Sequence, residues 1–138
     1  MNSRRMAESF LDEAELRLKT AQKALSDQHF SYAIRQSQEC VELSLKGTLR
    51  FVGVEPPKWH DVGLILRKES KRFPESFKNE IDRLSLISRE LAGERERSMY
   101  GDDELKLAPE ELYTKLDAQE AVDNARFVYE LSRKLLKV

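Results

Sequence analysis

Apolar residues recur every three or four positions through most of this chain, and no segment alternates apolar and polar residues with a period of two. A spacing of three and four places side chains on one face of an α-helix, whereas a half-buried strand requires strict alternation. The first such seam lies in residues 3–27 and consists of Leu11, Ala14, Leu18, Ala21 and Leu25. The pattern predicts an all-α protein.

The second predicted helix has a seam of mostly small residues and ends at Gly53. Its seam consists of Phe30, Ala33, Ser37, Cys40, Ser44 and Thr48. Small side chains allow a neighbouring backbone to approach closely, so we expect this helix to lie centrally in a bundle. It cannot continue through Pro56-Pro57, because proline lacks an N–H donor and restricts the residue before it.

The rest of the sequence predicts two further long helices and one short one. Asp61 can cap a short helix through Val62–Leu66, a longer helix spans about residues 75–98, and the last begins at Asp117, with Glu120 placed as in a capping box. Residues 101–116 lack a sustained period and are expected to form an ordered loop with one turn after Pro109. We therefore expect one domain over residues 3–138, an up-and-down antiparallel four-helix bundle with a short additional helix.

The composition excludes several classes of function. One cysteine rules out a disulfide framework, and two histidines 31 residues apart leave little for a metal centre, so neither a metal nor a cofactor is expected. The net charge of −1 argues against a protein that binds nucleic acid through a broadly basic face. No apolar run approaches the roughly 20 residues of a membrane helix, and no signal-peptide core follows the N-terminal arginines, so a cytoplasmic protein is expected.

No catalytic motif stands out. The chain has no Gly-rich phosphate loop, no HExxH and no Glu-x-x-His pair. Cys40 lies within a small-residue seam, which predicts a buried and inert thiol, because reactive thiols need an exposed electropositive setting. The paired carboxylates are expected by chance in a chain with 36% charged residues.

The loop Pro56–Asp61 is the first candidate site, because it carries the only tryptophan and one of the two histidines to a helix start. In one interpretation Trp59 plugs the end of the bundle, His60 bonds locally and Asp61 caps the helix. In the other, Lys58 and His60 contact a phosphate of a ligand or partner.

The second candidate site is an arginine-rich helix end formed by Arg89, Arg95, Arg97 and Tyr100. Arg89 and Arg97 fall about two turns apart on nearly one face. Guanidinium groups suit phosphate, and a tyrosine can stack on a base. Alternatively, interleaved acidic residues neutralise the arginines in a salt-bridged helix face; these are Glu90, Glu94 and Glu96.

Residues 31–46, SYAIRQSQECVELSLK, resemble the central helix of the HEPN domain (higher eukaryotes and prokaryotes nucleotide-binding). The resemblance extends to His60-Asp61-Val62-Gly63 after a proline-rich loop, to the arginine-rich helix end leading to Tyr100-Gly101-Asp102, and to the alanine-rich last helix. It covers nearly the whole chain in the right order.

The resemblance implies an up-and-down four-helix bundle with a short extra helix, usually a dimer. Many prokaryotic members of the family accompany minimal nucleotidyltransferases in toxin–antitoxin-like pairs. Its active members are metal-independent RNases with an Arg-x4-6-His motif, often followed by a tyrosine, and the dimer brings two motifs together over an RNA phosphate. With Tyr100 taken as that tyrosine, Ser98 occupies the histidine position and the arginine position falls near Gly93. A general acid or base that titrates near neutral pH is thus missing there.

Three functions follow from these observations. The first is a non-catalytic HEPN-like homodimer that binds a nucleotide or RNA, a minimal nucleotidyltransferase, or both. The second is a divergent metal-independent RNase toxin that uses Arg97 and His60. The third is a scaffolding bundle without a ligand.

Overall fold

The computed structural model describes residues 3–137, and no extended strand occurs among them. The elements in chain order are α1 (Ser3–Ser26), α2 (Phe30–Phe51), α3 (Gly63–Lys68), the 3-10 turn η1 (Ser70–Arg72), α4 (Glu75–Lys78), α5 (Ile81–Gly93), α6 (Arg95–Tyr100), α7 (Pro109–Leu112) and α8 (Lys115–Leu136). The prediction of an all-α protein is confirmed.

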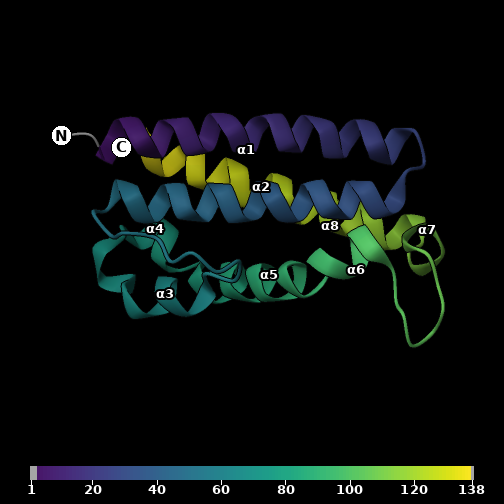
Figure 1. Cartoon of the computed structure of the whole chain (residues 1–138). Helices are drawn as coiled ribbons and strands as arrows, with labels where there is room; N and C mark the ends of the chain where they lie inside the picture. Colours follow the sequence, from purple (N-terminus) through teal and green to yellow (C-terminus); the bar gives the residue numbers. More distant parts are fainter. Residues whose placement is uncertain (1–2, 138) are drawn as a thin grey trace.

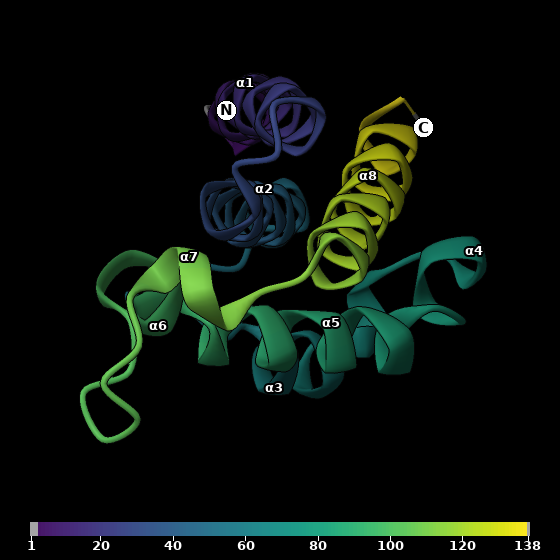
Figure 2. The same cartoon turned by 90° about the vertical axis from the view of Figure 1, so that its right-hand side faces the viewer.

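The long elements run up and down in an antiparallel bundle (Figure 1). α1 and α2 lie side by side, α8 packs against both, and α5 with α3 forms the opposite layer (Figure 2). The start of α1 lies beside the end of α8, where the Arg4 guanidinium donates a hydrogen bond to the Leu136 carbonyl. The predicted bundle is therefore confirmed, with α4, α5 and α6 together occupying the place of one long helix.

The predicted central helix is central. α2 contacts α1, α5, α6, α7 and α8. Its seam residues Ser37, Cys40, Ser44 and Thr48 are completely buried. α1 approaches closely at Gly47, where an added Cβ would lie 2.9 Å from Leu11 Cδ2. The small residues thus allow several helices to pack around one.

The helix predicted over about residues 75–98 is instead broken into three pieces. Its apolar seam is nonetheless buried as expected, at Phe77, Ile81, Leu84, Ile87 and Leu91. The break between α5 and α6 follows Gly93, a weak helix former, and the Glu94 N–H donates to the Leu91 carbonyl at 3.0 Å. This tighter turn redirects the chain, so one straight helix was the wrong prediction.

The last helix begins two residues earlier than predicted. Thr114 is its N-cap: the Asp117 N–H donates to Thr114 Oγ1 at 3.2 Å, and the Thr114 N–H donates to Asp117 Oδ2 at 2.9 Å. Asp117 is therefore the third residue of the helix, and the capping box joins Thr114 to Asp117.

The connection between α6 and α8 contains the predicted turn after Pro109, which is α7. Before it, Asp102 and Leu107 exchange backbone hydrogen bonds of 2.9 and 3.1 Å around a tight loop. Gly101 enters this loop with a φ of 84°, and a Cβ there would lie 2.3 Å from the Leu107 carbonyl oxygen, so only glycine fits. In the part of the chain that the structure describes, no helix is long and apolar enough to cross a membrane.

Candidate functional site

An open pocket of about 310 Å³ lies between the loop that precedes α3 and the junction of α5 with α6. His60 lines it from the loop, and Arg95 and Arg97 line it from α6. These three residues come from both candidate sites of the sequence analysis, which the fold thus brings together. The pocket also includes Ala92, Gly93 and Glu96.

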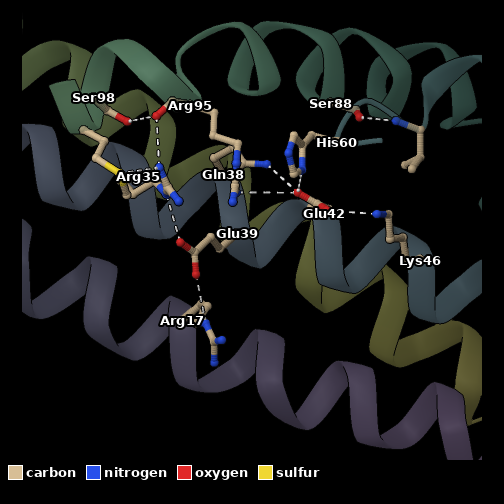
Figure 3. A network of polar contacts seen from close by, with 12 residues as sticks. Arg17, Arg35, Gln38, Glu39, Glu42, Lys46, His60, Ser88, Arg95 and Ser98 are labelled. Carbon is tan, nitrogen blue, oxygen red and sulfur yellow. Dashed lines mark hydrogen bonds and ion pairs between the residues drawn. The ribbon is translucent and has the colours of Figure 1, made fainter. Parts of the chain in front are cut away.

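Glu42 of α2 organises the cationic side of this pocket (Figure 3). Its carboxylate accepts hydrogen bonds from Gln38 Nε2 at 2.8 Å and from Lys46 Nζ at 2.9 Å. Glu42 Oε1 also lies 2.9 Å from His60 Nδ1 and 3.8 Å from Arg95 Nη1. One half-buried carboxylate therefore holds the histidine and faces two further cations.

The charge of Glu42 decides how His60 is presented. Burial alone would raise the pKa of the Glu42 carboxyl, but the hydrogen bonds from Lys46, Gln38 and His60 outweigh it and hold the pKa below its usual value. An ionised carboxylate only accepts, so His60 donates through Nδ1–H. Its Nε2 takes no part in this contact.

Arg95 is fixed at both its side chain and its backbone. Arg95 Nη1 donates to Gln38 Oε1 at 2.7 Å, while the Arg95 carbonyl accepts from Arg35 Nη1 and from Ser98 Oγ, both at 3.1 Å. Arg35 in turn pairs with Glu39 at 2.9 Å. These contacts anchor the start of α6 to α2.

The Glu39 carboxylate extends this network to α1, because it also pairs with Arg17 at 3.1 Å. A chain of polar contacts therefore joins α1, α2 and α6 across the bundle. Such a network fixes the position of Arg95, so that its side chain does not move freely on the surface.

Arg97 has acidic partners on two sides. Its guanidinium lies 3.1 Å from Asp102 Oδ2 and 3.7 Å from Glu94 Oε1, and its side chain remains 42% exposed. Hydrogen bonds from the Leu105 backbone and from Arg97 lower the pKa of Asp102. Glu94 also accepts a hydrogen bond of 2.7 Å from the Tyr113 hydroxyl. The guanidinium is thus held at the pocket while part of it still faces solvent.

The predicted neutralisation by interleaved acids is correct only for Glu94. Glu90 and Glu96 form no ion pair within residues 3–137. The other counter-charges are Glu42 and Asp102, which lie outside α5 and α6. Arg95 is therefore paired with a carboxylate on another helix, whereas both partners of Arg97 lie within five residues of it in sequence.

The remaining predicted site residues lie apart from this cluster. Arg89 lines a separate groove between α3 and α5, so the break at Glu94 undoes the single face predicted for Arg89 and Arg97. Tyr100, at the end of α6, is 74% exposed. Lys58 is exposed in the loop before His60. None of these three lines the pocket of His60.

Trp59 does not plug the end of the bundle as predicted, because its side chain is 60% exposed. The space beside α5 is filled by Val62 and Leu66, which are completely buried. The local bonding predicted for His60 is also wrong, since its partner Glu42 lies on α2.

Asp61 bonds the first N–H of α3 as a capping residue would, although the N-cap position itself is occupied by Val62, one residue later than predicted. Asp61 Oδ1 accepts hydrogen bonds of 3.0 Å from the Gly63 N–H and from Ser88 Oγ. Ser88 Oγ also accepts a hydrogen bond from the Val62 N–H at 3.0 Å (Figure 3). Asp61 therefore ends the loop and fixes its last turn against α5, which places His60 beside α2.

Gln38 and Glu42 were not among the predicted site residues. The one available signal was the spacing of Gln38, Glu42 and Lys46, which places polar side chains four residues apart along one face of the predicted central helix. The prediction for Cys40 is confirmed: the thiol is buried, and burial raises its pKa to about 12. The described residues include no group of three or more side chains that could hold a metal ion.

This arrangement defines the class of protein. It is an antiparallel helical bundle with a pocket at the α5–α6 junction that is lined by cationic side chains. The chain belongs to the HEPN family, since the HEPN domain model matches residues 7–135. No curated protein is significantly similar to it in sequence.

Two solved structures share the fold over nearly their whole length. One is the protein TT1696 from Thermus thermophilus, with 23% identity, a TM-score of 0.74, and coverage of 97% of this chain and 98% of that protein. The other is ST0689, an archaeal HEPN homologue, with 26% identity, a TM-score of 0.72, and coverage of 94% of this chain and 97% of that protein.

Proposed function

We propose that this chain is a non-catalytic HEPN protein that forms a homodimer and binds the phosphate of a nucleotide or RNA in the pocket of His60, Arg95 and Arg97. The observation that carries the proposal is the convergence of these three residues on one open pocket. Arg95 and His60 are held by acceptors on α2, so little conformational freedom remains to be lost when an anion binds. Lys58, Arg89 and Tyr100 lie outside the pocket and are candidates for contacts with the rest of a larger ligand.

The proposal that the protein is non-catalytic is based on Ser98. It stands at the position that the family resemblance gives to a histidine, it is buried, and its hydroxyl donates to the Arg95 carbonyl. A hydroxyl in that position cannot exchange protons near neutral pH as a histidine does. We infer that Ser98 supports α6 and takes no part in chemistry.

Calorimetric titration with ATP and with AMP tests the pocket. Saturable binding is expected, and Arg97→Ala should weaken it by roughly 10- to 100-fold, which corresponds to a charge-assisted hydrogen bond of about 1.5–3 kcal/mol. Arg126→Ala is the matched control, because Arg126 also pairs with an aspartate, at 3.2 Å, but lies on α8. No heat with either nucleotide would favour the ligand-free scaffold.

A second candidate function is a divergent metal-independent RNase, favoured by the presence of Arg97 and His60 in one pocket. His60 is held by Glu42 in the form that leaves Nε2 available to accept a proton. Incubation with labelled tRNA or mRNA in EDTA decides between the candidates. Cleavage that disappears in both Arg97→Ala and His60→Ala would support the RNase and contradict the non-catalytic proposal.

The proposed protein partner is a minimal nucleotidyltransferase in a toxin–antitoxin-like pair. The support is membership of the HEPN family. Co-expression with a nucleotidyltransferase encoded beside this chain should yield a complex that co-purifies through two chromatographic steps. Separate elution of the two proteins would contradict this part of the proposal.

A further inference from the structure

A second open pocket, of about 420 Å³, lies among α5, α7 and α8, where α8 passes over α5 (Figure 2). We call it the α8 pocket. Its volume is within the range of about 300–1,000 Å³ that is typical of sites for small molecules. Arg97 lines both this pocket and the pocket of His60, and the other residues that line the two pockets differ. The α8 pocket is therefore a separate cavity with its own chemistry.

The floor of the α8 pocket is apolar. It consists of side chains that belong to the core and are at most 6% exposed; these are Ile34, Ile87, Leu91 and Ala121. Leu112 of α7 adds a half-buried apolar wall. Because the removal of apolar surface from water is favourable, this floor favours a ligand with a hydrocarbon part.

Four carboxylates surround the apolar floor, two from each of two walls. Glu90 and Glu94 lie about one turn apart at the end of α5, and Asp117 and Glu120 lie about one turn apart at the start of α8. Among the described residues, the one cation that lines the pocket is Arg97, which also pairs with Asp102 outside it. Four carboxylates against one guanidinium leave an excess of three negative charges. The pocket therefore favours a cationic ligand.

Two of the four carboxylates are available to such a ligand. Glu90 and Glu120 are exposed, and neither forms an ion pair within residues 3–137. In contrast, Glu94 accepts a hydrogen bond of 2.7 Å from the Tyr113 hydroxyl, and Asp117 accepts one from the backbone N–H that precedes α8. One available carboxylate thus lies on α5 and the other on α8.

The carboxylates of the α8 pocket are not arranged around a single metal ion. Within the part of the chain that the structure describes, no group of three or more Asp, Glu, His or Cys side chains could hold one. A divalent metal ion requires several oxygen ligands at about 2.0–2.6 Å from one point. A cation whose charges are separated by a hydrocarbon chain fits better, because each ammonium can meet one carboxylate while the methylene groups cover the apolar floor.

We propose that the α8 pocket binds a linear aliphatic polyamine. Its ammonium groups pair with Glu90 and Glu120, and its methylene groups cover Ile87, Leu91 and Ala121. A lysine side chain of a protein partner carries only one ammonium and would leave one of the two carboxylates unpaired, so a free polyamine is the favoured ligand. This site is additional to the nucleotide or RNA site of the proposed function.

Calorimetric titration with spermidine at about 0.15 M salt, where distant charges are screened, tests the site. Saturable binding of one molecule per chain is expected. The double variant Glu90→Gln/Glu120→Gln should weaken it by at least about tenfold, because two ammonium–carboxylate pairs are lost. Both positions are exposed and free of ion pairs in the described chain, so the variant should fold normally.

The matched control is Glu75→Gln/Glu130→Gln. It removes the same charge from two exposed positions outside the α8 pocket and should change the affinity by less than about twofold. Equal weakening by the two double variants would show that spermidine responds only to the net charge, which would overturn the site. The absence of saturable heat with the wild type would also overturn it.

The length of the ligand tests the apolar floor at constant charge. Diaminopropane, cadaverine and Mg²⁺ each carry two positive charges, but cadaverine has two more methylene groups than diaminopropane and Mg²⁺ has none. Cadaverine should bind about three- to tenfold more tightly than diaminopropane, because the additional methylene groups are buried on the floor. Equal binding of all three ions would overturn the role of the floor.

Titration with a trilysine peptide distinguishes a free polyamine from a protein segment. Tighter binding of the peptide than of spermidine would assign the pocket to a protein partner and overturn the proposed ligand. These results are separable from those of the nucleotide titration, because His60 and Arg95 do not line the α8 pocket. Loss of spermidine binding with intact nucleotide binding would therefore overturn this site alone.

Discussion

His60 Nδ1 lies 2.9 Å from Glu42 Oε1, which ties the loop before α3 to the central helix α2. The same carboxylate accepts from Lys46 and faces Arg95, so it balances the positive charge of the candidate site. A single acidic residue, remote in sequence from the arginines, therefore sets the geometry and the electrostatics of the pocket.

Replacement Glu42→Gln should lower the free energy of unfolding at pH 7 by about 1–3 kcal/mol, because Lys46 and Arg95 lose the charge that faces them. Guanidinium denaturation followed by circular dichroism measures the change. Glu130→Gln, on the exposed face of α8, is the control and should stay within about 0.5 kcal/mol of the wild type.

The effect of Glu42→Gln should depend on pH. The pKa of Glu42 is lowered in the folded chain, so its contribution to stability is complete above the unfolded-state pKa of about 4.3 and is lost as the pH falls through the folded-state value. We therefore expect the difference between wild type and variant to shrink progressively as the pH falls below about 4.3. A difference that persists unchanged there would contradict this assignment of charge.

Two glycine replacements should have opposite effects on thermal stability. Gly47→Ala should destabilise by about 1–3 kcal/mol, because the new Cβ would meet Leu11 at 2.9 Å and the Ala7 carbonyl at 3.3 Å. Gly93→Ala should leave stability unchanged or raise it by up to about 1 kcal/mol, since no atom lies within 4 Å of that Cβ. Differential scanning calorimetry measures both, and equal effects would contradict the close approach of α1 and α2.

The Cys40 thiol should not react with Ellman's reagent in the folded protein at pH 8. Burial raises its pKa to about 12, so almost none of it is the reactive thiolate, and the surrounding helices block access. One equivalent should react after denaturation. The variant Leu16→Cys should show one fast-reacting thiol under native conditions, and fast labelling of the wild type would contradict the buried position.

Native Trp59 fluorescence should report a tryptophan in contact with water. Acrylamide should quench it nearly as well in the folded chain as in the denatured one, because the side chain is 60% exposed. The signal is unambiguous, since Trp59 is the only tryptophan. Emission protected from quenching in the native state would favour the plug that the sequence suggested.

Much of the fold could be predicted because helix formation is local. The apolar seams located α1, α2 and α8 to within about two residues, and small residues at Ser37, Cys40 and Ser44 indicated a central helix. The breaks on either side of α5 were not predicted, because a continuous apolar seam remains buried even when the hydrogen-bonding pattern of the helix is interrupted.

The candidate site was predicted only as a set of residue types. Arginine at positions 95 and 97 and histidine at position 60 were identified, yet nothing along the chain indicated that Arg95 and His60 meet at Glu42, or that Arg89 faces a different groove. Those relations depend on which face of each helix packs inward.

The sequence by itself determined the class of fold, the family and the buried position of Cys40, because periodicity and composition express burial directly. Only the tertiary structure decided which charges pair and which large side chains stay exposed. Trp59 looks apolar enough for the core, but its side chain is 60% exposed, whereas the nearby Val62 and Leu66 are completely buried. The sequence does not show whether the counter-charge of an arginine lies four residues away or on another helix. Only the packing of the helices brings Glu42 to Arg95.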